Sequence, residues 1–242
     1  MYTAILSDIH ANLEALDAIC RVCDERRVDS WVCLGDIVGY GADPGPCLER
    51  TRALTDQVVL GNHDAAATDL LDLTYFNDYA RAAALWTADQ LDQDEKSYLA
   101  NLPLFREHED AFYVHAEPRD PGSWGYVHSR SDARAALGAV PTQFCFIGHS
   151  HQPFMCVQNG TEIEPIIAAG PVEIEADQRY LVNIGSVGQP RDGDARSCFL
   201  IWSQASGTLE LIRVEYDIPA AQKKIIAAGL PPFLAQRLAL GH

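Results

Sequence analysis

Two short motifs place potential metal ligands two residues apart, directly after an apolar run. The stretch "TAILSDIHAN" brings Asp8 and His10 to the end of the first run, and "FCFIGHSHQP" brings His149 and His151 to the end of another. Side chains at i and i+2 of extended backbone point to the same side. We therefore expect each pair to present two ligands to one point.

Three more potential ligands, Asp36, Asn62 and His115, follow the apolar runs "SWVCLG", "QVVLG" and "AFYV". Ligands of open α/β sheets bind in the crevice beyond the carboxyl ends of the strands. A set of carboxylates, an amide and imidazoles suits Mn, Fe, Zn, Co or Ni better than Mg or Ca. Seven ligands are too many for one ion with an open position, so we expect two divalent transition-metal ions that share a carboxylate, with Mn²⁺ as the first candidate.

Each of these residues also has an ordinary structural interpretation. A lone Asp after Gly is typical of a turn, Asn12 stands where a helix N-cap belongs, and a single strand-end histidine such as His115 commonly packs in a core. Seven coincidences at strand ends, two of them as spaced pairs, favour a shared site instead.

The rest of the sequence predicts the elements that position these residues. A β-α-β-α-β beginning favours a parallel sheet, and the later short strands indicate a second sheet of antiparallel hairpins. Strands are expected at 2–6, 30–34, 57–60, 111–115, 144–149, 153–158, 161–167, 171–176, 179–184, 197–203 and 208–216. Helices are expected at 12–27 and 46–54, in a lid-like segment at 64–102, and from Pro219 onward with a break at Pro231-Pro232.

Composition and charge narrow the class of protein. The 242 residues hold 18 basic against 34 acidic side chains, a net charge of −16, which disfavours nucleic-acid polymers and membrane surfaces as partners. A small phosphorylated substrate remains compatible, because bound metal reverses the local sign of the field. Without an apolar run long enough for a membrane span or a signal-peptide pattern, we expect a cytoplasmic protein with a single domain, residues 1–242. The oligomeric state stays open.

Seven cysteines are scattered along the chain, and the odd number with no secretory signal argues against a disulfide framework. Cys20 and Cys23 form a single CxxC within the helix expected at 12–27. Leu13 and Leu16 fall on the same stripe, so we interpret this pair as reduced thiols on a buried helix face.

In order along the chain, "DIH", "GDIVGYG", "GNHD", a lone histidine after a strand and "GHSH" resemble the motifs of calcineurin-like metallophosphoesterases. The resemblance covers residues 4 to about 192 and is greatest to the small bacterial branch of phosphodiesterase and diadenosine-tetraphosphatase-like proteins. It implies an α/β fold, a four-layer αββα sandwich of two mixed sheets. The chain departs from that branch in two places: Ala11 stands where glycine is common, and "AEPRD" replaces "GSPRD", which adds the charge of Glu117.

The resemblance also implies how the ligands divide between two ions. One ion is held by Asp8, His10, Asp36 and His151; the other is held by Asp36, Asn62, His115 and His149, with Asp36 bridging. The implied function is that of a dinuclear metal-dependent phosphoesterase, which hydrolyses small phosphodiesters or phosphomonoesters through attack of a metal-bridging hydroxide.

Other residues are expected to contact the substrate rather than a metal ion. His63 adjoins Asn62 and cannot share its face, so we expect His63 to be catalytic, donating a hydrogen bond or a proton to the phosphoryl or leaving-group oxygen. Asp64 either orients His63 or caps the helix that follows, and capping is favoured. The remaining candidates for substrate contacts are Asn12, Tyr40, Arg119 and Arg191, although structural salt bridges are an equal alternative for the two arginines.

Other functions fit the sequence less well or stay open. A metal-free protein-binding scaffold of the same fold, as in a retromer subunit, would have lost ligands, whereas every ligand position is filled here. A diadenosine polyphosphate hydrolase stays open as a variant of the same chemistry. A cupin-type oxygenase would place a Glu soon after H-x-H, and a protein Ser/Thr phosphatase would place an Arg after "GD"; this chain has neither.

Overall fold

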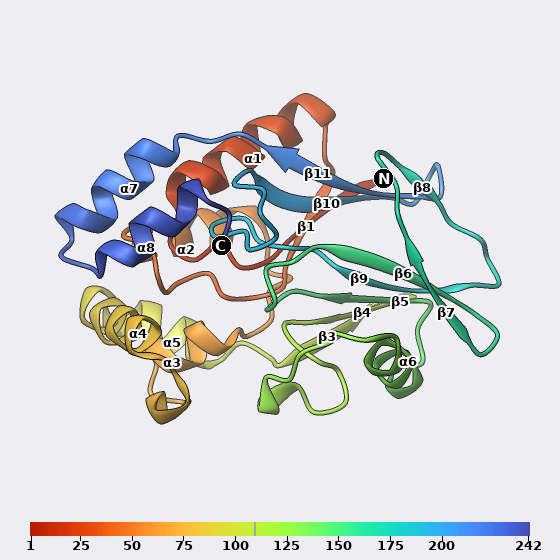
Figure 1. Cartoon of the computed structure of the whole chain (residues 1–242), viewed down its shortest axis with the longest axis horizontal. Coiled ribbons are helices and arrows are strands. Elements are labelled where there is room, and N and C mark those ends of the chain that lie inside the picture. The colour runs from red at the N-terminus through yellow and green to blue at the C-terminus, as the bar shows by residue number, and fades with distance from the viewer. Residues whose placement is uncertain (109) are drawn as a thin grey trace.

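Two mixed β-sheets face each other in the structure, a computed structural model that describes residues 1–108 and 110–242. Figure 1 shows the two sheets stacked across the middle of the molecule. In spatial order the first sheet consists of β2 (Ser30–Cys33), β1 (Tyr2–Leu6), β10 (Ser197–Ser203), β11 (Thr208–Val214) and β8 (Val172–Glu173). The second consists of β3 (Phe105–His108), β4 (Ala111–Val114), β5 (Phe144–Ile147), β9 (Arg179–Asn183), β6 (Phe154–Asn159) and β7 (Glu162–Ile166).

Strand directions make both sheets mixed. In the first sheet β1 runs parallel to β2 and antiparallel to β10. In the second sheet β4, β5 and β9 are parallel, and β6 is antiparallel to β9. The strands β1, β4 and β5 end at the same side of the molecule (Figure 1), and Asp8, His115 and His149 follow those ends in the sequence.

Successive side chains of a strand point to opposite faces of its sheet, and this alternation builds the helix and sheet layers. In β1, Ala4 and Leu6 pack toward α1 (Leu13–Arg26), whereas Ile5 between them packs toward the second sheet. In β5, Phe144 and Phe146 complete the core between the sheets, and Cys145 faces the opposite way toward α6 (Arg130–Ala139). This is the four-layer αββα sandwich that the family resemblance implies.

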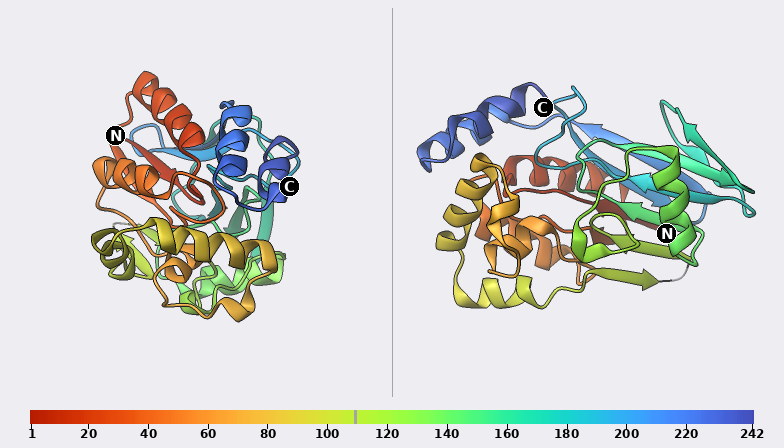
Figure 2. Two further views of the ribbon diagram at one scale, coloured as in Figure 1. Left: turned by 90° about the vertical axis from the view of Figure 1, so that its left-hand side faces the viewer. Right: turned by 60° about the horizontal axis from the view of Figure 1, so that its bottom comes forward.

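Helices gather at the end of the sandwich beyond the parallel strands. Two views agree that the C-terminal helices lie on one side of this end and the helices of residues 62–100 on the other (Figures 1 and 2). They are α2 (Pro44–Leu54), α3 (Asn62–Ala67), α4 (Asp78–Gln90), α5 (Gln93–Ala100), α7 (Ile218–Ala227) and α8 (Pro232–Gln236), with 3₁₀ turns at Leu73–Tyr75, Pro121–Ser123 and Arg237–Ala239. No helix of the described residues is long and apolar enough to cross a membrane.

Several sequence predictions are wrong. Residues 57–60 form no strand; only Val58 makes an isolated bridge, to Cys33 at the edge of the first sheet. The late strands do not all join the second sheet, because β10 and β11 return to pair beside β1. Helix α6 and strand β3 were not expected, although Ser129 and Asp132 form a capping box, a recognisable start signal for α6.

All seven cysteines lie in the described part of the chain, where each is buried with a free thiol. Burial raises the pKa of the Cys156 thiol to about 11 and that of Cys198 to about 12. The prediction of reduced cysteines packed on apolar faces, including Cys20 and Cys23 on α1, is confirmed.

Candidate metal centre

The predicted ligand pairs lie in loops rather than on the strands. Strands β1 and β5 end before them, and Asp8, His10, His149 and His151 have φ angles of 54°, 49°, 66° and 58°. The expectation that extended backbone points each pair to one side is therefore wrong. Left-handed backbone is costly for residues other than glycine, so tertiary contacts must hold these turns.

Hydrogen bonds between neighbouring loops provide those contacts. The main-chain N–H of Asp8 donates to the carbonyl of Gly35 at 3.1 Å, and that of His10 donates to the carbonyl of Asp36 at 2.9 Å. The N–H of His149 donates to Oδ2 of Asp8 at 3.0 Å. Asp36, itself at φ 52°, is thus locked beside the loop after β1, and the loop after β5 is locked to Asp8.

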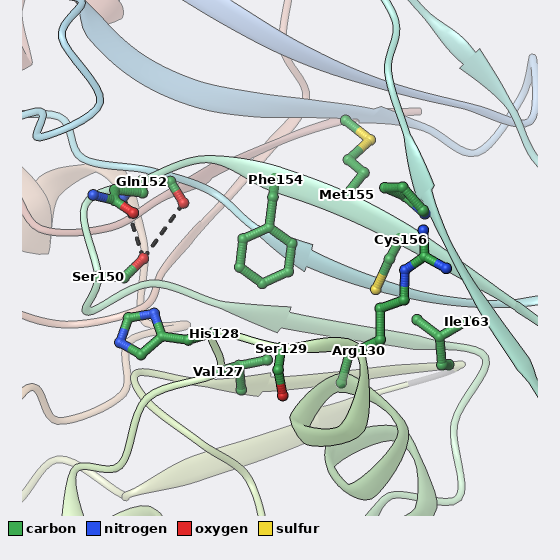
Figure 3. Close-up of a pocket in the computed structure, with 12 residues that line it drawn as sticks. Val127, His128, Ser129, Arg130, Ser150, Gln152, Phe154, Met155, Cys156 and Ile163 are labelled. Atoms are coloured by element: carbon green, nitrogen blue, oxygen red, sulfur yellow. Dashed lines mark hydrogen bonds between the residues drawn. The ribbon is translucent and has the colours of Figure 1, made fainter.

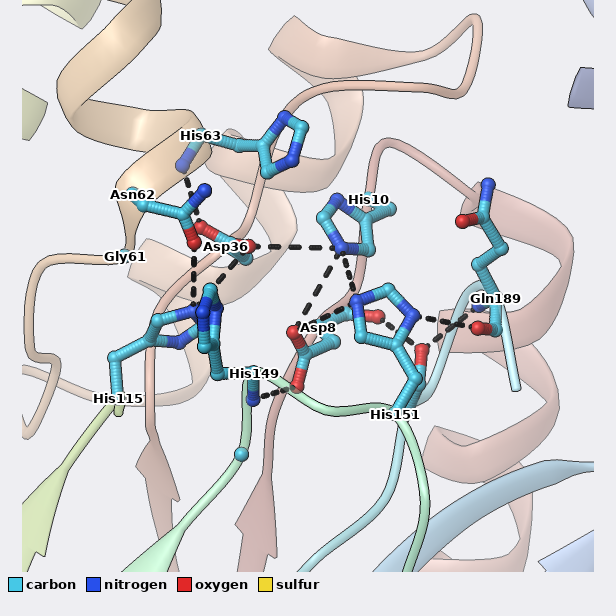
Figure 4. Close-up of polar contacts among 12 residues, drawn as sticks. Asp8, His10, Asp36, Gly61, Asn62, His63, His115, His149, His151 and Gln189 are labelled. Atoms are coloured by element: carbon cyan, nitrogen blue, oxygen red, sulfur yellow. Dashed lines mark hydrogen bonds and ion pairs between the residues drawn. The ribbon is translucent and has the colours of Figure 1, made fainter. Parts of the chain in front are cut away.

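Two groups of potential ligand atoms result, Asp8 with His10 and His151, and Asp36 with His115 and His149. In the first group, Nε2 of His151 lies 3.1 Å from Oδ1 of Asp8 and 3.0 Å from Nε2 of His10. The second group is Asp36, His115 and His149, each offering a ligand atom within 4.8 Å of the others. Figure 4 shows His151 beside His10 and His149 beside His115, so neighbours in sequence serve different groups.

Asp36 lies between the two groups, and Asn62 joins the second. Oδ2 of Asp36 is 3.3 Å from Nε2 of His115 and 3.6 Å from Nε2 of His10. Its other oxygen, Oδ1, accepts a hydrogen bond from the main-chain N–H of His63 at 2.8 Å. Oδ1 of Asn62 is 3.1 Å from Nε2 of His115. One carboxylate oxygen is therefore free to face ligands of both groups.

The imidazoles are oriented by main-chain carbonyl groups. Nδ1 of His10, His115 and His151 faces a carbonyl oxygen, which can only accept, so each Nδ1 carries a hydrogen. The acceptors are Val38 at 3.2 Å, Leu34 at 2.8 Å and Gln189 at 2.6 Å, respectively. With Nδ1 held in this way, Nε2 of each ring points into the centre and can bind a metal ion once it carries no proton; a carbonyl at Nδ1 is the usual outer contact of a metal-binding histidine.

Buried acceptors without hydrogen-bond partners show that a cation fits. Among the described residues, Oδ1 of Asp8, Oδ2 of Asp36 and Nε2 of His149 have no such partner, and the residues are 0%, 1% and 8% exposed. The two carboxylate oxygens have only the imidazoles of His151 and His115 beside them, at 3.1 and 3.3 Å, and burying acceptors without hydrogen bonds is costly. Two ligand atoms bound to one ion at about 2.1 Å and at right angles stand roughly 3 Å apart, which matches the 3.0 Å between His10 and His151.

Electrostatics of the ion-free centre agree with this donor set. Burial opposes the charge of Asp36, but neighbouring His115 holds the pKa of the carboxyl well below its usual range. Burial alone would lower the pKa of His115, yet Asp36 raises it to about 9. Burial lowers the pKa of His149 to about 4, aided by His115, and lowers that of His151 to about 3, aided by Arg191.

His63 differs from the ligand histidines. Its Nδ1 is buried and has no hydrogen-bond partner in the described chain, and the residue lies in the first turn of α3. Its ring packs 4.9 Å from that of His10, 4.3 Å from Tyr40 and 4.8 Å from Phe76. Burial holds the pKa of His63 well below its usual range, so the ring is neutral and keeps one N–H to donate.

Asp64 does not contact the ring of His63. Its carboxylate accepts from the main-chain N–H groups of Val38 and Gly61, both at 3.1 Å. Of the two roles considered for Asp64, the structure therefore shows the cap of α3. Burial and the charge of Asp36 raise the pKa of Asp64 to about 7.

Of the predicted substrate residues, Tyr40 lies at the centre and Asn12 is engaged elsewhere. The Tyr40 ring is 4.8 Å from that of His10. Asn12 Oδ1 accepts from the N–H of Ala15 to cap α1, and Nδ2 donates to the carbonyl of Gly188 at 2.8 Å. Both ends of the Asn12 amide are thus used within the fold, which leaves the substrate role without geometric support.

The two candidate arginines occupy different environments. Arg119 Nε lies 2.6 Å from Oε1 of Glu117, so the salt bridge considered for it is present and neutralises the charge that Glu117 adds. Arg191 instead has its guanidinium carbon 5.4 Å from the centroid of the Tyr40 ring, and its Nη2 donates to Oε1 of Gln189 at 2.7 Å. Its main-chain N–H donates to the carbonyl of His151. No ion pair neutralises the charge of Arg191 among the described residues.

A cleft of about 570 Å³ adjoins the centre, and His63, His149 and Tyr40 line it. Sequence reasoning missed three other aromatic residues of its lining: Phe76, Trp124 and Tyr126. The available signal was the aromatic pair in "GSWGY", a glycine-rich stretch soon after His115.

A separate hollow of about 270 Å³ lies behind the loop that carries His149 and His151 (Figure 3). Ser150 lines this hollow, where its hydroxyl contacts the main chain of Gln152. The serine between the two ligands therefore points away from the centre.

Comparisons with known proteins agree with this geometry. The model of the calcineurin-like phosphoesterase superfamily domain matches residues 1–205. The uncharacterized protein MJ0912 of Methanocaldococcus jannaschii is 39% identical over 244 residues, covering 99% of this chain and 98% of that protein. The crystal structure of a metallophosphoesterase from Sphaerobacter thermophilus is 38% identical, with a TM-score of 0.88 over 100% of this chain and 99% of that one. The hypothetical protein PH1004 from Pyrococcus horikoshii, 20% identical with a TM-score of 0.82, covers 100% and 98% and shares the fold.

Proposed function

The chain belongs to the calcineurin-like phosphoesterase superfamily, and we propose that it hydrolyses small phosphodiesters at a centre of two divalent metal ions. The observation that supports this most is the arrangement of lone pairs. Buried Asp8 Oδ1, Asp36 Oδ2 and His149 Nε2 have no hydrogen-bond partner among the described residues, and all lie within the two ligand groups. A fold that buries such acceptors together is stabilised by cations placed among them.

The ligands divide between the ions as follows in this proposal. One ion is held by Asp8, His10, Asp36 and His151, and the other by Asp36, Asn62, His115 and His149. Asp36 is the shared ligand because its Oδ2 faces histidines of both groups. Nitrogen and oxygen donors in this proportion suit Mn²⁺, with Fe, Zn, Ni or Co as alternatives.

Bound ions would activate a water molecule as the nucleophile and offset the charge that develops on the phosphoryl oxygens. The chain's own residues orient the substrate. Neutral His63 lines the cleft and donates its remaining N–H to a phosphoryl or leaving-group oxygen. Arg191, beside Tyr40, donates from Nη2 to Oε1 of Gln189 at 2.7 Å and offers its remaining guanidinium N–H groups to a second phosphoryl oxygen.

Residues 64–102 favour small substrates. Leu71, Phe76, Asn77 and Ala80 of this segment line the cleft, so the segment acts as its lid-like wall. The segment carries eight acidic residues against Arg81 and Lys96. Such a wall repels long polyanions, and the cleft volume of about 570 Å³ falls in the range of small-molecule sites. Both features favour small diesters over nucleic-acid polymers.

The test compares metal-stripped protein with protein refilled with Mn²⁺. The substrates are bis-p-nitrophenyl phosphate, p-nitrophenyl phosphate, cyclic nucleotides and diadenosine polyphosphates. We expect Mn²⁺ to restore hydrolysis, with the diester bis-p-nitrophenyl phosphate cleaved faster than the monoester. Faster cleavage of the monoester or of diadenosine polyphosphates would replace the diesterase assignment. A protein that binds no ion and cleaves none of these substrates would be a scaffold of the same fold.

A further inference from the structure

Trp124 has a backbone conformation that a large side chain seldom adopts. It lies in the left-handed region, with φ 56° and ψ 38°, directly after the 3₁₀ turn at Pro121–Ser123. A bulky residue in this region is an outlier whose cost must be compensated by the surrounding structure. Such outliers concentrate at functional sites, and Trp124 lines the cleft beside the metal centre.

The cleft has aromatic side chains on both sides. Phe76 comes from the lid-like segment 64–102, and Trp124 comes from the loop that follows His115. Tyr40 and His63 belong to the same lining next to the ligand groups. A flat group that enters the cleft therefore meets ring faces or edges from two separate segments of the chain.

Tyr126 is already engaged within the fold. Its ring stacks on His149 at 4.3 Å with an interplanar angle of 22°, and on His128 at 5.0 Å with an angle of 13°. Trp124, by contrast, contacts His115 only edge to face, with ring centroids 6.0 Å apart. In the described chain no ring is stacked on the indole, so Trp124 keeps a face for a ligand.

We propose that Trp124 is a stacking platform for a planar aromatic group of the substrate, so that the preferred substrates are phosphodiesters of nucleosides. This rests on the proposed function, because the phosphoryl group of such a substrate would lie at the metal centre. The indole contacts the ring of His115, a proposed metal ligand, so Trp124 lies directly beside the metal centre. The aromatic group must therefore be joined to phosphorus by a short linkage, as in a nucleoside 5′-phosphate.

The binding measurement compares two ligands that differ only in the base: adenosine 5′-monophosphate and ribose 5-phosphate. Each is titrated into Mn²⁺-loaded protein in a calorimeter. We expect the adenosine compound to bind roughly tenfold more tightly, as one base–aromatic stack provides. Equal dissociation constants for the two ligands would overturn the platform.

Two substitutions of Trp124 separate stacking from packing. Trp124→Phe keeps a ring face and should retain most of the preference, whereas Trp124→Leu should abolish it. The dissociation constant of ribose 5-phosphate is also measured for each variant. General damage to the cleft weakens both ligands and so cancels from the ratio of the two dissociation constants. The matched control is Tyr79→Leu, since Tyr79 is 47% exposed, stacks on Phe233 and lies outside the cleft lining. A preference that survives Trp124→Leu would remove Trp124 from the site.

A second pair of ligands, phenyl phosphate and methyl phosphate, distinguishes preference for a nucleobase from preference for any aromatic ring. The dissociation constants of phenyl phosphate and methyl phosphate are compared in the same way. If their ratio equals that of the adenosine and ribose ligands, Trp124 accepts any aromatic ring, and the nucleoside assignment is wrong. Hydrolysis of bis-p-nitrophenyl phosphate by the same preparation reports the proposed function separately. Hydrolysis with equal binding of the adenosine and ribose ligands rejects only the platform. Preferential adenosine binding without hydrolysis rejects only the esterase.

Discussion

The Nε2 atoms of His10 and His151 lie 3.0 Å apart, although 141 residues separate the two histidines in sequence. Each ring is oriented by a carbonyl at Nδ1, of Val38 and Gln189 respectively. With each Nδ1 donating to a carbonyl, the two Nε2 atoms face each other, so a proton or a metal cation must lie between them. A bound metal ion would take both Nε2 lone pairs, as the proposed centre requires.

Gly61 tests how tightly the shared carboxylate is held. A Cβ at Gly61 would lie 2.1 Å from Oδ1 of Asp36 and 2.2 Å from its main-chain nitrogen. Gly61→Ala should therefore displace Asp36, destabilise the protein by about 1–3 kcal/mol and lower metal content. The matched control is Gly138→Ala in α6, where a Cβ meets nothing within 4 Å and the helix should gain about 0.5–1 kcal/mol. Full metal content in Gly61→Ala would show that Asp36 tolerates displacement.

His63→Ala should separate catalysis from metal binding. Because His63 faces the cleft through a neutral ring and contributes no atom to either ligand group, metal content should stay unchanged. Loss of one positioned donor should lower kcat by about 10²–10³-fold for a poor leaving group. The loss should shrink for p-nitrophenolate, which leaves without help. Metal loss in His63→Ala, measured by elemental analysis, would make His63 a ligand instead.

Arg191 and Arg119 form a natural pair for comparison. Arg191→Gln should lower kcat/KM about tenfold or more, the usual effect of losing a hydrogen bond from a charged group. Arg119→Gln should change kcat/KM little, because Arg119 already pairs with Glu117 and its side chain is 53% exposed. Steady-state kinetics on one diester decide between the arginines. If the two substitutions lowered kcat/KM equally, the effect of Arg191 would come from its charge near the cleft and not from contact with the phosphate.

Metal binding should release a proton at neutral pH. In the ion-free protein the pKa of His115 is raised to about 9, so its Nε2 is protonated at pH 7 and must lose that proton to a metal ion. Affinity should therefore fall about tenfold for each pH unit below 9. Calorimetry in buffers of different ionisation enthalpy counts the proton released. Affinity that is constant between pH 7 and 9 would show that His115 is neutral or does not bind the ion.

Much of the site could be predicted because its residues stand in short motifs. Asp8 with His10 and His149 with His151 are adjacent in sequence, and their place after apolar runs marks one end of a sheet. The prediction of their backbone conformation is wrong, because contacts remote in sequence hold the left-handed φ angles. Asp8 and His10 donate to the carbonyls of Gly35 and Asp36, and His149 donates to the carboxylate of Asp8. Local pattern carries no information about such contacts.

The fold shows the same limit. The parallel β1–β2 pair follows from alternating strands and helices, but β10 joins β1 across almost two hundred residues, through pairs such as Ile5 with Leu200. Only packing of the finished core selects that neighbour. Trp124 was missed for a related reason: an aromatic residue in a glycine-rich loop is usually a packing residue, and its exposure to the cleft depends on where Phe76 and α4 lie.

The most direct test of the account is the metal content of Asp36→Asn. Asparagine keeps the volume and the acceptor that Oδ1 presents to the N–H of His63, so the fold should survive. It removes the charge that faces His10 and His115 from between the two ligand groups. Protein saturated with Mn²⁺ and then desalted should retain two ions per chain in the wild type, and fewer than two in Asp36→Asn with loss of activity. Two retained ions in Asp36→Asn would contradict the shared-ligand centre.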